Sequence, residues 1–350
     1  MIANLAHPVQ VRHRERRSLN ILRVKIVGTG IALPAQETSS CQLDYHLGLP
    51  DGTSFKQTGV RRRFLSKTET AAQLAAHACN AALENAGLAW KDIDCLVSTS
   101  ATMDQALPYN AALIHAELGL ASQRTTTFDI NASCMSFLAG LDTMSYSIEC
   151  GRYRHVMLVS ADIATFGIDW SKLKEGGIFG DGAAAAVIRR SVEGESANIL
   201  ASKMVTLSAG VGYCKVPGGG SRYHPRRLTT PFDPLSLFQM EGKPVFKLIA
   251  SELPAFADNL LADAGLTMKQ IAMVVPHQAS RLAMNHLTRR LKISSHQLVD
   301  VFSDYGNQVG ASLPTALHLG LAEGRVKRGD PILLIGTGAG LTMGGMVLTY

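Results

Sequence analysis

The sequence has few charged and few aromatic residues, and it has no long uncharged apolar segment. Charged residues make up 18% and aromatic residues 6% of the 350 positions, whereas hydrophobic residues make up 46%. This hydrophobic content excludes a disordered chain, because it provides enough apolar surface for an extensive core. Without a segment of about 18 uncharged apolar residues, a membrane-spanning helix is not expected. The composition is typical of a soluble, well-packed α/β protein.

The cysteines lack the spacing of a metal site or of a disulfide framework. No Cys-x-x-Cys pair occurs among the six cysteines, which are Cys41, Cys79, Cys95, Cys134, Cys150 and Cys214. The first residues also lack the continuous apolar stretch of a signal peptide, because Arg12, Arg14, Arg16 and Arg17 interrupt them. We therefore expect reduced thiols, a cytoplasmic location and no metal ion.

The formal net charge is +6, and much of it is concentrated in short arginine runs. These runs are the stretch before Leu19, Arg61–Arg63, Arg226–Arg227 and Arg289–Arg290. A basic surface can meet nucleic acid, anionic lipid, an acidic protein or a phosphate-bearing cofactor, although a single run is more often solvated charge. No nucleic-acid-binding motif accompanies the runs, and aromatic residues are few, so nucleic acid is the least favoured partner.

The most informative residue is Cys134, which lies between a short apolar segment and a helical pattern. Phe128-Asp129-Ile130 is typical of a strand, and apolar residues then follow at helical spacing from Leu138 to Ile148. Cys134 is therefore expected at a helix N-terminus, where unpaired backbone N–H groups and the helix dipole stabilise a thiolate. This position suits a nucleophile. Taken alone, such a residue is more often a buried structural thiol.

A histidine and an asparagine further along the chain complete the pattern. His277 follows an apolar strand in Val274-Val275-Pro276-His277-Gln278-Ala279, and Asn307 lies in the turn Gly306-Asn307-Gln308-Val309-Gly310. Singly, the histidine is more often a core residue and the asparagine a turn residue. With these three residues in this order, the chain resembles the 3-oxoacyl-(acyl-carrier-protein) synthase III family of the thiolase superfamily. The resemblance extends from about Val24 to Tyr350.

A weak internal repeat is visible in the chain. Residues 83–97 (LENAGLAWKDIDCLV) are similar to residues 261–275 (LADAGLTMKQIAMVV), and each block is typical of a helix that ends at glycine, a short loop and a buried strand. Phe128-Asp129-Ile130 and Val299-Asp300-Val301 match more faintly, each as the start of the next strand. Helices between buried strands predict a mostly parallel sheet, covered on both faces, in each half of the chain.

The repeat predicts an α/β protein built from two similar halves. We expect a basic extension at residues 1–22, a first half at 23–195 with Cys134, and a second half at 196–350 with His277 and Asn307. Residues 214–240, rich in proline and glycine, are expected to form an inserted loop. The resemblance implies that the halves pack as the thiolase-like five-layer αβαβα sandwich. The catalytic residues would then meet at strand ends along the seam between the halves.

The resemblance implies a condensing enzyme that acts on thioesters. Cys134 would take an acyl group from a carrier, and His277 and Asn307 would hold the thioester carbonyl of a malonyl unit while carbon dioxide leaves. The carbanion would then attack the acyl group and give a 3-oxoacyl thioester. The implied substrates are acyl-coenzyme A and malonyl-acyl-carrier protein. No bound cofactor, no membrane association and a homodimer are also implied.

Further site positions follow from the same resemblance. The backbone N–H groups of Cys134 and of the loop that holds Gly338 and Ala339 would form an oxyanion hole. Substrate-binding positions are implied at Leu107, Phe246 and Ser280. A basic surface for the acidic acyl-carrier protein is implied at Lys247, Arg281, Arg289 and Arg290.

The chain departs from the family at positions that affect the acyl donor. Thr53 and Gln57 stand where well-studied members have the Trp and Arg that hold the adenine of coenzyme A. An acyl-carrier protein is therefore a second candidate donor. Leu107 stands where many members have Phe beside the acyl tunnel across the dimer interface. The smaller side chain favours a primer other than acetyl.

Other functions fit parts of the pattern. The main alternative is an acyltransferase on the same fold that moves the acyl group to an O, N or other acyl acceptor; Asn307 disfavours it, because such relatives often lose this residue. A Cys-His-Asn peptidase would need a local cysteine signature that is absent here, and a non-catalytic binding module would not need all three polar groups. No βαβ unit follows Gly336–Gly340, so a dinucleotide site is rejected. Fatty-acid initiation and specialised-metabolite assembly both stay open.

Overall fold

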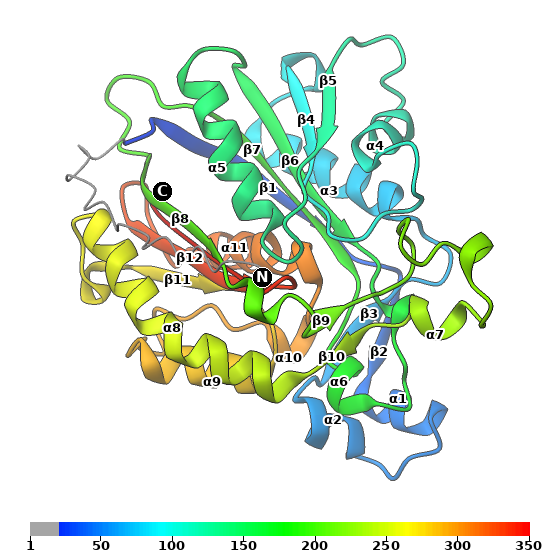
Figure 1. Cartoon of the computed structure of the whole chain (residues 1–350). Helices are drawn as coiled ribbons and strands as arrows, with labels where there is room; N and C mark the ends of the chain where they lie inside the picture. The colour runs from blue at the N-terminus through cyan, green and yellow to red at the C-terminus, as the bar shows by residue number, and fades with distance from the viewer. Residues whose placement is uncertain (1–20) are drawn as a thin grey trace, which may run out of the picture.

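The computed structural model describes residues 21–350, so nearly all of the predicted extension at residues 1–22 lies outside the described residues. Two β-sheets alternate with three layers of helices in the order α-β-α-β-α (Figure 1). This is the five-layer α/β sandwich that the family resemblance implies.

The first sheet has five strands in the order β1-β7-β6-β4-β5. Their bounds are β1 (Val24–Ala32), β4 (Cys95–Ser98), β5 (Thr126–Asp129), β6 (His155–Asp162) and β7 (Gly182–Arg190). β4 is parallel to β5 and β6, but β7 is antiparallel to β1 and β6. Four of the five strands therefore run in the same direction, as expected for a mostly parallel sheet, and β7 alone is reversed. The segment between β6 and β7 carries only the short helix α6 (Leu173–Gly176), not a helix that crosses the sheet.

The second sheet has four strands in the order β11-β12-β13-β8. Their bounds are β8 (Asn198–Thr206), β11 (Met273–Pro276), β12 (Pro331–Gly338) and β13 (Thr342–Thr349). β11 and β12 are parallel, whereas β13 is antiparallel to both β12 and β8. The strand predicted at Val299–Val301 is reduced to one isolated bridge between Leu298 and Val274, so the second half only partly repeats the first.

Two helices, α5 (Ser136–Glu149) and α11 (Ser312–Ala322), lie between the sheets (Figure 1). One cluster of buried residues contains Leu141 of α5, Leu317 of α11, Leu158 of the first sheet and Leu334 of the second. Because strand side chains alternate between faces, the neighbouring Val159 packs on the outer side of the first sheet instead. The core therefore joins both halves of the chain.

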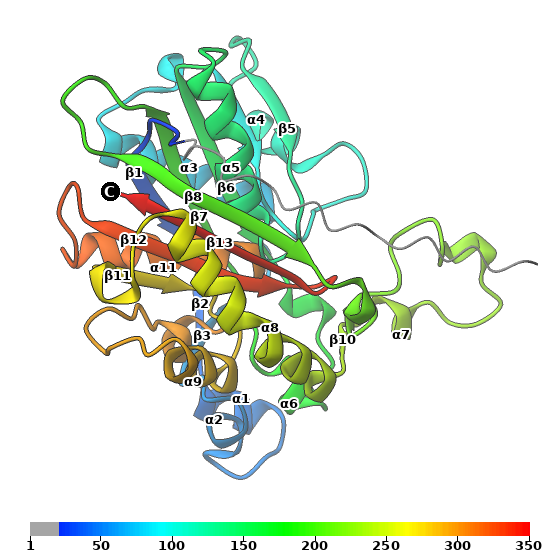
Figure 2. The ribbon, with the colours of Figure 1, turned by 60° about the vertical axis from the view of Figure 1, so that its left-hand side comes forward.

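Outer helices cover the remaining face of each sheet. α3 (Ala71–Ala86) and α4 (Asn110–Glu117) cover the first sheet, and α8 (Gly242–Asp263) and α9 (Arg281–Arg290) lie on the outer side of the second (Figure 2). α3 lies so close to β1 that a Cβ on Gly30 would come within 2.4 Å of the backbone nitrogen of Ala82. Only glycine allows this approach without a shift of the helix.

The predicted repeat is present in three dimensions. α3 ends at Gly87 (φ 66°) and α8 is followed by Gly265 (φ 69°), and each glycine adopts the left-handed conformation. The backbone N–H of Leu88 donates to the carbonyl of Leu83 at 3.0 Å, and that of Leu266 donates to Leu261 at the same distance. The chain then enters β4 in one half and β11 in the other. The helix ends of the two halves are therefore built alike.

Smaller elements surround the sandwich. They are β2 (Gln36–Ser39), α1 (Ser40–His46), α2 (Thr53–Thr58), β3 (Arg62–Leu65), β9 (Cys214–Lys215), α7 (Asp233–Ser236), β10 (Gln239–Met240) and α10 (Phe302–Tyr305). Residues 214–240, predicted as an inserted loop, thus hold a β9–β10 ladder and α7. No helix within residues 21–350 combines the length and apolar content needed to cross a membrane.

Not all of the arginine run at 61–63 is solvated charge. Arg63 is 1% exposed and donates hydrogen bonds to the carbonyls of Gly177 and Phe179. Burial lowers its pKa to about 10. Arg61 and Arg62, in contrast, are on the surface and both pair with Asp304.

Candidate active site

Cys134 lies on a sharp turn between β5 and α5. The preceding residue, Ser133, has φ 55°, a left-handed conformation that is uncommon for a residue with a side chain. The side chain of Asn131 accepts a hydrogen bond from the N–H of Ser133 at 2.9 Å and supports this turn. α5 begins two residues after Cys134, at Ser136. The structure therefore places the thiol just before a helix, partly exposed.

The electrostatic surroundings of Cys134 differ from the expectation of a stabilised thiolate. Burial raises the pKa of the Cys134 thiol to about 12, and the nearby Asp162 and Cys214 add to this effect. The backbone N–H groups of Ala339 and of Cys134 itself act in the opposite direction, but they do not overcome burial. Burial therefore outweighs the stabilisation of the thiolate that the helix N-terminus provides. The thiol is protonated at neutral pH and must lose its proton as it reacts.

His277 follows β11 directly and is held in a buried, neutral state. Its N–H donates to the carbonyl of Ile335 on β12 at 2.9 Å, and the residue is 5% exposed. Burial lowers the pKa of His277 to about 4, so the imidazole is uncharged near neutral pH. Within residues 21–350, its Nδ1 has no hydrogen-bond partner. A neutral ring can donate through one nitrogen only.

Asn307 is fixed in position by both its backbone and its side chain. Its N–H donates to the carbonyl of Ile178 at 2.8 Å. Its Oδ1 accepts from the N–H of Val309 at 2.9 Å and from the hydroxyl of Ser312 at 3.3 Å. Its Nδ2 donates to the carbonyl of Ala279 at 3.2 Å. Because an amide nitrogen carries two hydrogens, one N–H stays available to a ligand.

The glycine-rich end of β12 brings these segments together. A Cβ on Gly336 would lie 2.6 Å from the His277 Cβ and 2.7 Å from the Met135 Cε, so both residues pack against this glycine. A Cβ on Gly338 would lie 3.3 Å from the backbone nitrogen of Cys134. The Ala339 N–H that lowers the Cys134 pKa follows directly. The backbone N–H groups of Cys134 and Ala339 thus lie near enough to the sulfur to lower the pKa of the thiol.

The other predicted substrate positions have different surroundings. Ser280 caps α9, where its hydroxyl accepts the N–H of Ala283 at 3.2 Å. Phe246 packs edge-to-face on His286, with ring centroids 4.7 Å apart. Leu107 is 84% exposed, so in a single chain it encloses no tunnel.

The predicted carrier-docking residues are divided between two environments. Arg281 is partly buried, pairs with Asp300 and lies 5.4 Å from the centroid of the Phe302 ring. It is therefore engaged within its own chain. Lys247, Arg289 and Arg290 are exposed, and none of them has an ion-pair partner within residues 21–350.

Two residues beside the nucleophile, Asp162 and Cys214, are not predicted from the sequence. Asp162, fully buried at the end of β6, accepts hydrogen bonds from the N–H groups of Ala101 at 2.9 Å and Ala311 at 3.1 Å; burial raises its pKa to about 6. The apolar run of β6 that ends in an aspartate was a usable signal. Cys214 on β9 is the second residue, and burial raises its pKa to about 11. No local pattern connects it with Cys134.

Within the described residues, no group of three or more His, Cys, Asp or Glu side chains is arranged to hold a metal ion. The site is instead a thiol that is only partly exposed, a neutral imidazole, an amide and two backbone N–H groups. Such a set is suited to acyl transfer through a covalent intermediate, with hydrogen-bond donors for oxygens that become negative.

Comparison with known proteins agrees with this chemistry. Family models described as 3-oxoacyl-[acyl-carrier-protein (ACP)] synthase III and its C-terminal part match residues 128–208 and 261–350. The beta-ketoacyl-[acyl-carrier-protein] synthase III of Bartonella tribocorum is 33% identical over 94% of this chain and 100% of its own. That of Aquifex aeolicus is 31% identical over 93% and 99%.

Solved structures give the same result. The crystal structure of 3-oxoacyl-[acyl-carrier-protein] synthase III from Aquifex aeolicus VF5 covers 93% of this chain and 100% of its own, at 30% identity and a TM-score of 0.83. The priming beta-ketosynthase from the R1128 polyketide biosynthetic pathway covers 95% and 98%, at 29% identity and a TM-score of 0.85. The chain therefore belongs to the beta-ketoacyl-[acyl-carrier-protein] synthase III family of the thiolase superfamily and is an acyltransferase-class condensing enzyme.

Proposed function

We propose that Cys134 carries the acyl group of a decarboxylative condensation with malonyl-acyl-carrier protein. The observation that carries this proposal is that the Gly338–Ala339 turn packs against the backbone of Cys134, where the N–H groups of Ala339 and Cys134 lower the pKa of the thiol. In the first step the sulfur attacks the carbonyl carbon of an acyl thioester. The oxygen becomes negative and accepts both N–H groups. The bond to the carrier sulfur then breaks, and the Cys134 proton leaves with the carrier thiol.

In the second step His277 and Asn307 act on the malonyl thioester. The bond between the methylene carbon and the carboxylate breaks, and carbon dioxide leaves. The electron pair stays as an enolate, whose oxygen accepts hydrogen bonds from the imidazole Nε2 and the free N–H of the amide. A neutral His277 suits this role, because its pKa of about 4 keeps its protonation constant over the physiological range. The proton belongs on Nε2, since a buried N–H at Nδ1 would have no acceptor.

The third step forms the new carbon–carbon bond. The enolate carbon attacks the acyl carbonyl on Cys134, and the oxyanion again lies against the N–H groups of Cys134 and Ala339. Collapse expels the Cys134 sulfur, which takes a proton from solvent, and releases a 3-oxoacyl thioester on the carrier protein. The raised pKa of Cys134 favours this reprotonation. One proton is consumed and one carbon dioxide is released per product.

For the carrier protein we propose a docking surface formed by Lys247, Arg289 and Arg290. Burial and, to a smaller extent, Arg290 and Arg289 lower the pKa of His286, on which Phe246 packs, so α8 and α9 contribute basic side chains to one patch. An acidic carrier protein would approach this patch through long-range attraction. Arg281 is not part of the surface, because Asp300 engages it.

A charge reversal tests the docking surface. Arg289→Glu and Lys247→Glu should each raise the KM for malonyl-acyl-carrier protein about tenfold and change kcat little, because they remove binding and not chemistry. The matched control is Lys269→Glu, an exposed lysine on the loop before β11. An unchanged KM in both docking variants would refute the assignment of this surface.

We propose further that the protein is a homodimer joined along β5. This strand ends the first sheet, with one edge unpaired in the described chain. Met103 and Leu107, 56% and 84% exposed, lie on the loop between β4 and α4 beside it. An open edge strand flanked by exposed apolar side chains is a ready surface for pairing with a second copy. Sedimentation equilibrium should give a dimer mass, and Leu107→Asp should weaken the dimer.

Intact-mass spectrometry tests the central proposal. The protein is incubated with a panel of acyl-coenzyme A and acyl-carrier-protein thioesters. One acyl adduct per chain is expected, which disappears in Cys134→Ala and persists in the matched control Cys214→Ala. Malonyl-acyl-carrier protein should then discharge the adduct with release of carbon dioxide. An adduct that malonyl thioester leaves untouched would favour acyl transfer to another acceptor.

A further inference from the structure

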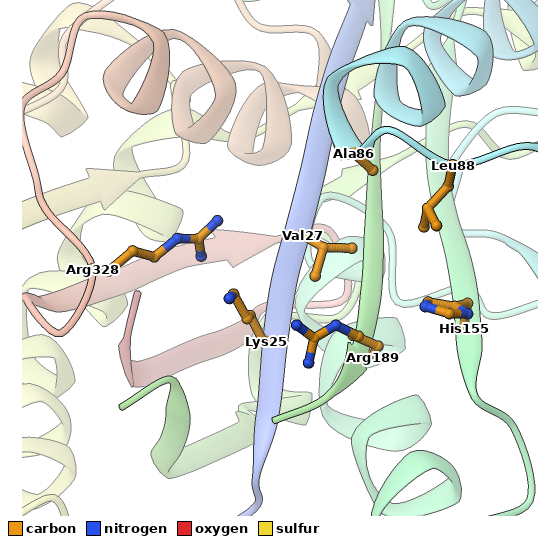
Figure 3. Close-up of a pocket in the computed structure, with 7 residues that line it drawn as sticks. All are labelled: Lys25, Val27, Ala86, Leu88, His155, Arg189 and Arg328. Atoms are coloured by element: carbon orange, nitrogen blue, oxygen red, sulfur yellow. The ribbon is translucent and has the colours of Figure 1, made fainter. Parts of the chain in front are cut away.

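A cavity lies at the end of the first sheet where β6 begins (Figure 3). Its volume is about 260 Å³, and it is lined by Lys25, Val27, Ala86, Leu88, His155, Arg189 and Arg328. β6 begins at His155, in the cavity, and ends at Asp162, beside Cys134. At about 3.3 Å per residue these strand ends are roughly 23 Å apart, so the cavity is separate from the catalytic residues.

Three basic side chains form a row across adjacent strands. Lys25 on β1 is directly opposite Arg189 on β7, and Arg189 is directly opposite His155 on β6. Residues directly opposite each other in antiparallel strands project from the same face of the sheet. Like charges in such positions repel and destabilise the sheet. A negatively charged ligand would therefore reduce the electrostatic repulsion between these side chains.

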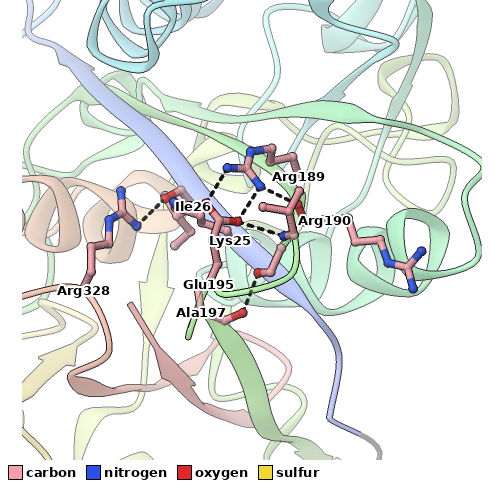
Figure 4. A network of polar contacts seen from close by, with 9 residues as sticks. Lys25, Ile26, Arg189, Arg190, Glu195, Ala197 and Arg328 are labelled. Atoms are coloured by element: carbon pink, nitrogen blue, oxygen red, sulfur yellow. Dashed lines mark hydrogen bonds and ion pairs between the residues drawn. The ribbon is translucent and has the colours of Figure 1, made fainter.

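One carboxylate offsets only part of the positive charge at the cavity (Figure 4). The carboxylate of Glu195 accepts a hydrogen bond from each terminal nitrogen of Arg189 at 2.8 Å and also forms an ion pair with Lys25. Arg328 donates to the carbonyl of Ile26 at 2.9 Å and lies over the Tyr350 ring, and no acid within residues 21–350 pairs with it. Lys25, Arg189 and Arg328 together carry three positive charges, and the single carboxylate of Glu195 leaves two of them at the cavity.

The remaining lining residues add a donor and an apolar floor. The Nδ1 of His155 bonds to the carbonyl of Asp92 at 3.1 Å, and because a carbonyl can only accept, this nitrogen carries a hydrogen. The Nε2 of His155 is left for a ligand and donates when the ring is protonated. Val27, Ala86 and Leu88 supply aliphatic surface beside the basic groups (Figure 3).

We propose that this cavity binds a phosphate monoester, with the phosphoryl group against Arg328, Arg189 and Lys25 and its carbon part on the apolar floor. Two surplus positive charges match a dianion, whereas a simple carboxylate would neutralise only one. Guanidinium groups also fit the oxygens of a phosphoryl group in paired hydrogen bonds. Lys25 and Arg189 belong to the first sheet, whereas Arg328 precedes β12 of the second. The ligand would therefore join the two sheets at this end.

Isothermal titration calorimetry at constant ionic strength tests the site, with phenyl phosphate, inorganic phosphate and benzoate as probes. We expect one phenyl phosphate per chain, bound at least tenfold more tightly than benzoate. Arg328→Gln should weaken this binding at least tenfold, and His155→Gln by a smaller factor. The matched control Arg154→Gln, an exposed arginine outside the cavity that pairs with Asp94, should bind as the wild type does. Cys134→Ala should also bind normally.

Three results would overturn the proposal. Phenyl phosphate that gives no saturable heat up to the millimolar range would remove the site. Equal binding by the wild type and by both folded cavity variants would place the phosphate elsewhere. Equal affinity for inorganic phosphate and phenyl phosphate would remove the role assigned to the apolar floor. Circular dichroism verifies that each variant is folded. Because Arg328→Gln lies in a loop and His155→Gln in a strand, the test still holds if one of the two variants does not fold.

Discussion

Replacement of Asn307 by aspartate should separate the two half-reactions of the enzyme. The substitution keeps the size and shape of the side chain, and the oxygen that accepts from Val309 and Ser312 is retained. The nitrogen that donates to the carbonyl of Ala279 becomes an oxygen that cannot donate. The Asn307→Asp variant therefore loses the free N–H proposed to hold the enolate, and it places a negative charge beside that enolate.

The expected magnitude follows from the number of donors lost. The structure leaves one N–H of Asn307 for substrate, because the other is bonded to Ala279. Loss of one preorganised donor to a developing oxyanion typically lowers a rate 10²–10³-fold, or about 2.7–4 kcal/mol. The carbon dioxide released from malonyl-acyl-carrier protein should fall by at least this factor. Acylation of Cys134 uses the backbone donors of Cys134 and Ala339 instead, and its rate should change less than about threefold.

The assay follows both half-reactions with the same enzyme preparation. Rapid-quench intact mass gives the rate of Cys134 acylation, and labelled malonyl-acyl-carrier protein gives the rate of carbon dioxide release. Asn198→Asp is the matched control, since its amide also donates to one backbone carbonyl, that of Ser196 at 2.9 Å, but lies far from the site at the start of β8. Equal losses of acylation and decarboxylation in Asn307→Asp would refute the separate roles assigned here.

Three further predictions concern titration and packing. Because the thiolate is the reactive form and the pKa of Cys134 is about 12, its rate of alkylation by iodoacetamide should rise about tenfold per pH unit between pH 7 and 10. Peptide mass spectrometry measures this rate, and a rate that stops rising below pH 9 would contradict the raised pKa. The pKa of His277 is lowered to about 4, whereas in the unfolded chain it is about 6.5, so on acidification the unfolded chain takes up a proton before the folded protein does. The free energy of unfolding should therefore fall as the pH drops from about 6.5 to 4. In urea unfolding, the wild type should lose about 2 kcal/mol more than His277→Phe between pH 7.5 and 5. Gly30→Ala would drive a Cβ into the backbone of Ala82 and should cost about 1–3 kcal/mol in urea unfolding, whereas Gly212→Ala, with open space around it, should cost little.

The features that were predicted correctly from the sequence depend mainly on local patterns of residues. The glycines at 87 and 265 marked two helix ends that are built with the same hydrogen bonds, since a left-handed cap depends on only a few neighbouring residues. The strand–turn–helix around Cys134 was visible for the same reason. The five-layer arrangement then followed from the repeat and from the family resemblance.

Features that depend on distant contacts were missed or wrongly predicted. The direction of β7 depends on how the chain returns after β6, which the local pattern does not encode. The pKa of Cys134 depends on burial and on Asp162, which is far away in sequence, and these outweigh the helix N-terminus that the local pattern revealed. Arg281 looked like a free surface charge, but Asp300 engages it. Strand direction, burial and ion pairing that depend on residues far apart in sequence therefore could not be predicted from local patterns.

The most direct test of the central claim is a single-turnover chase of the acyl group on Cys134. The enzyme is first loaded with an isotopically labelled acyl thioester, freed of excess donor and mixed with malonyl-acyl-carrier protein. The label should move from Cys134 into a 3-oxoacyl thioester on the carrier, with one carbon dioxide released per label. Label that leaves as a free acid, or that reaches an oxygen or nitrogen acceptor without carbon dioxide release, would contradict it.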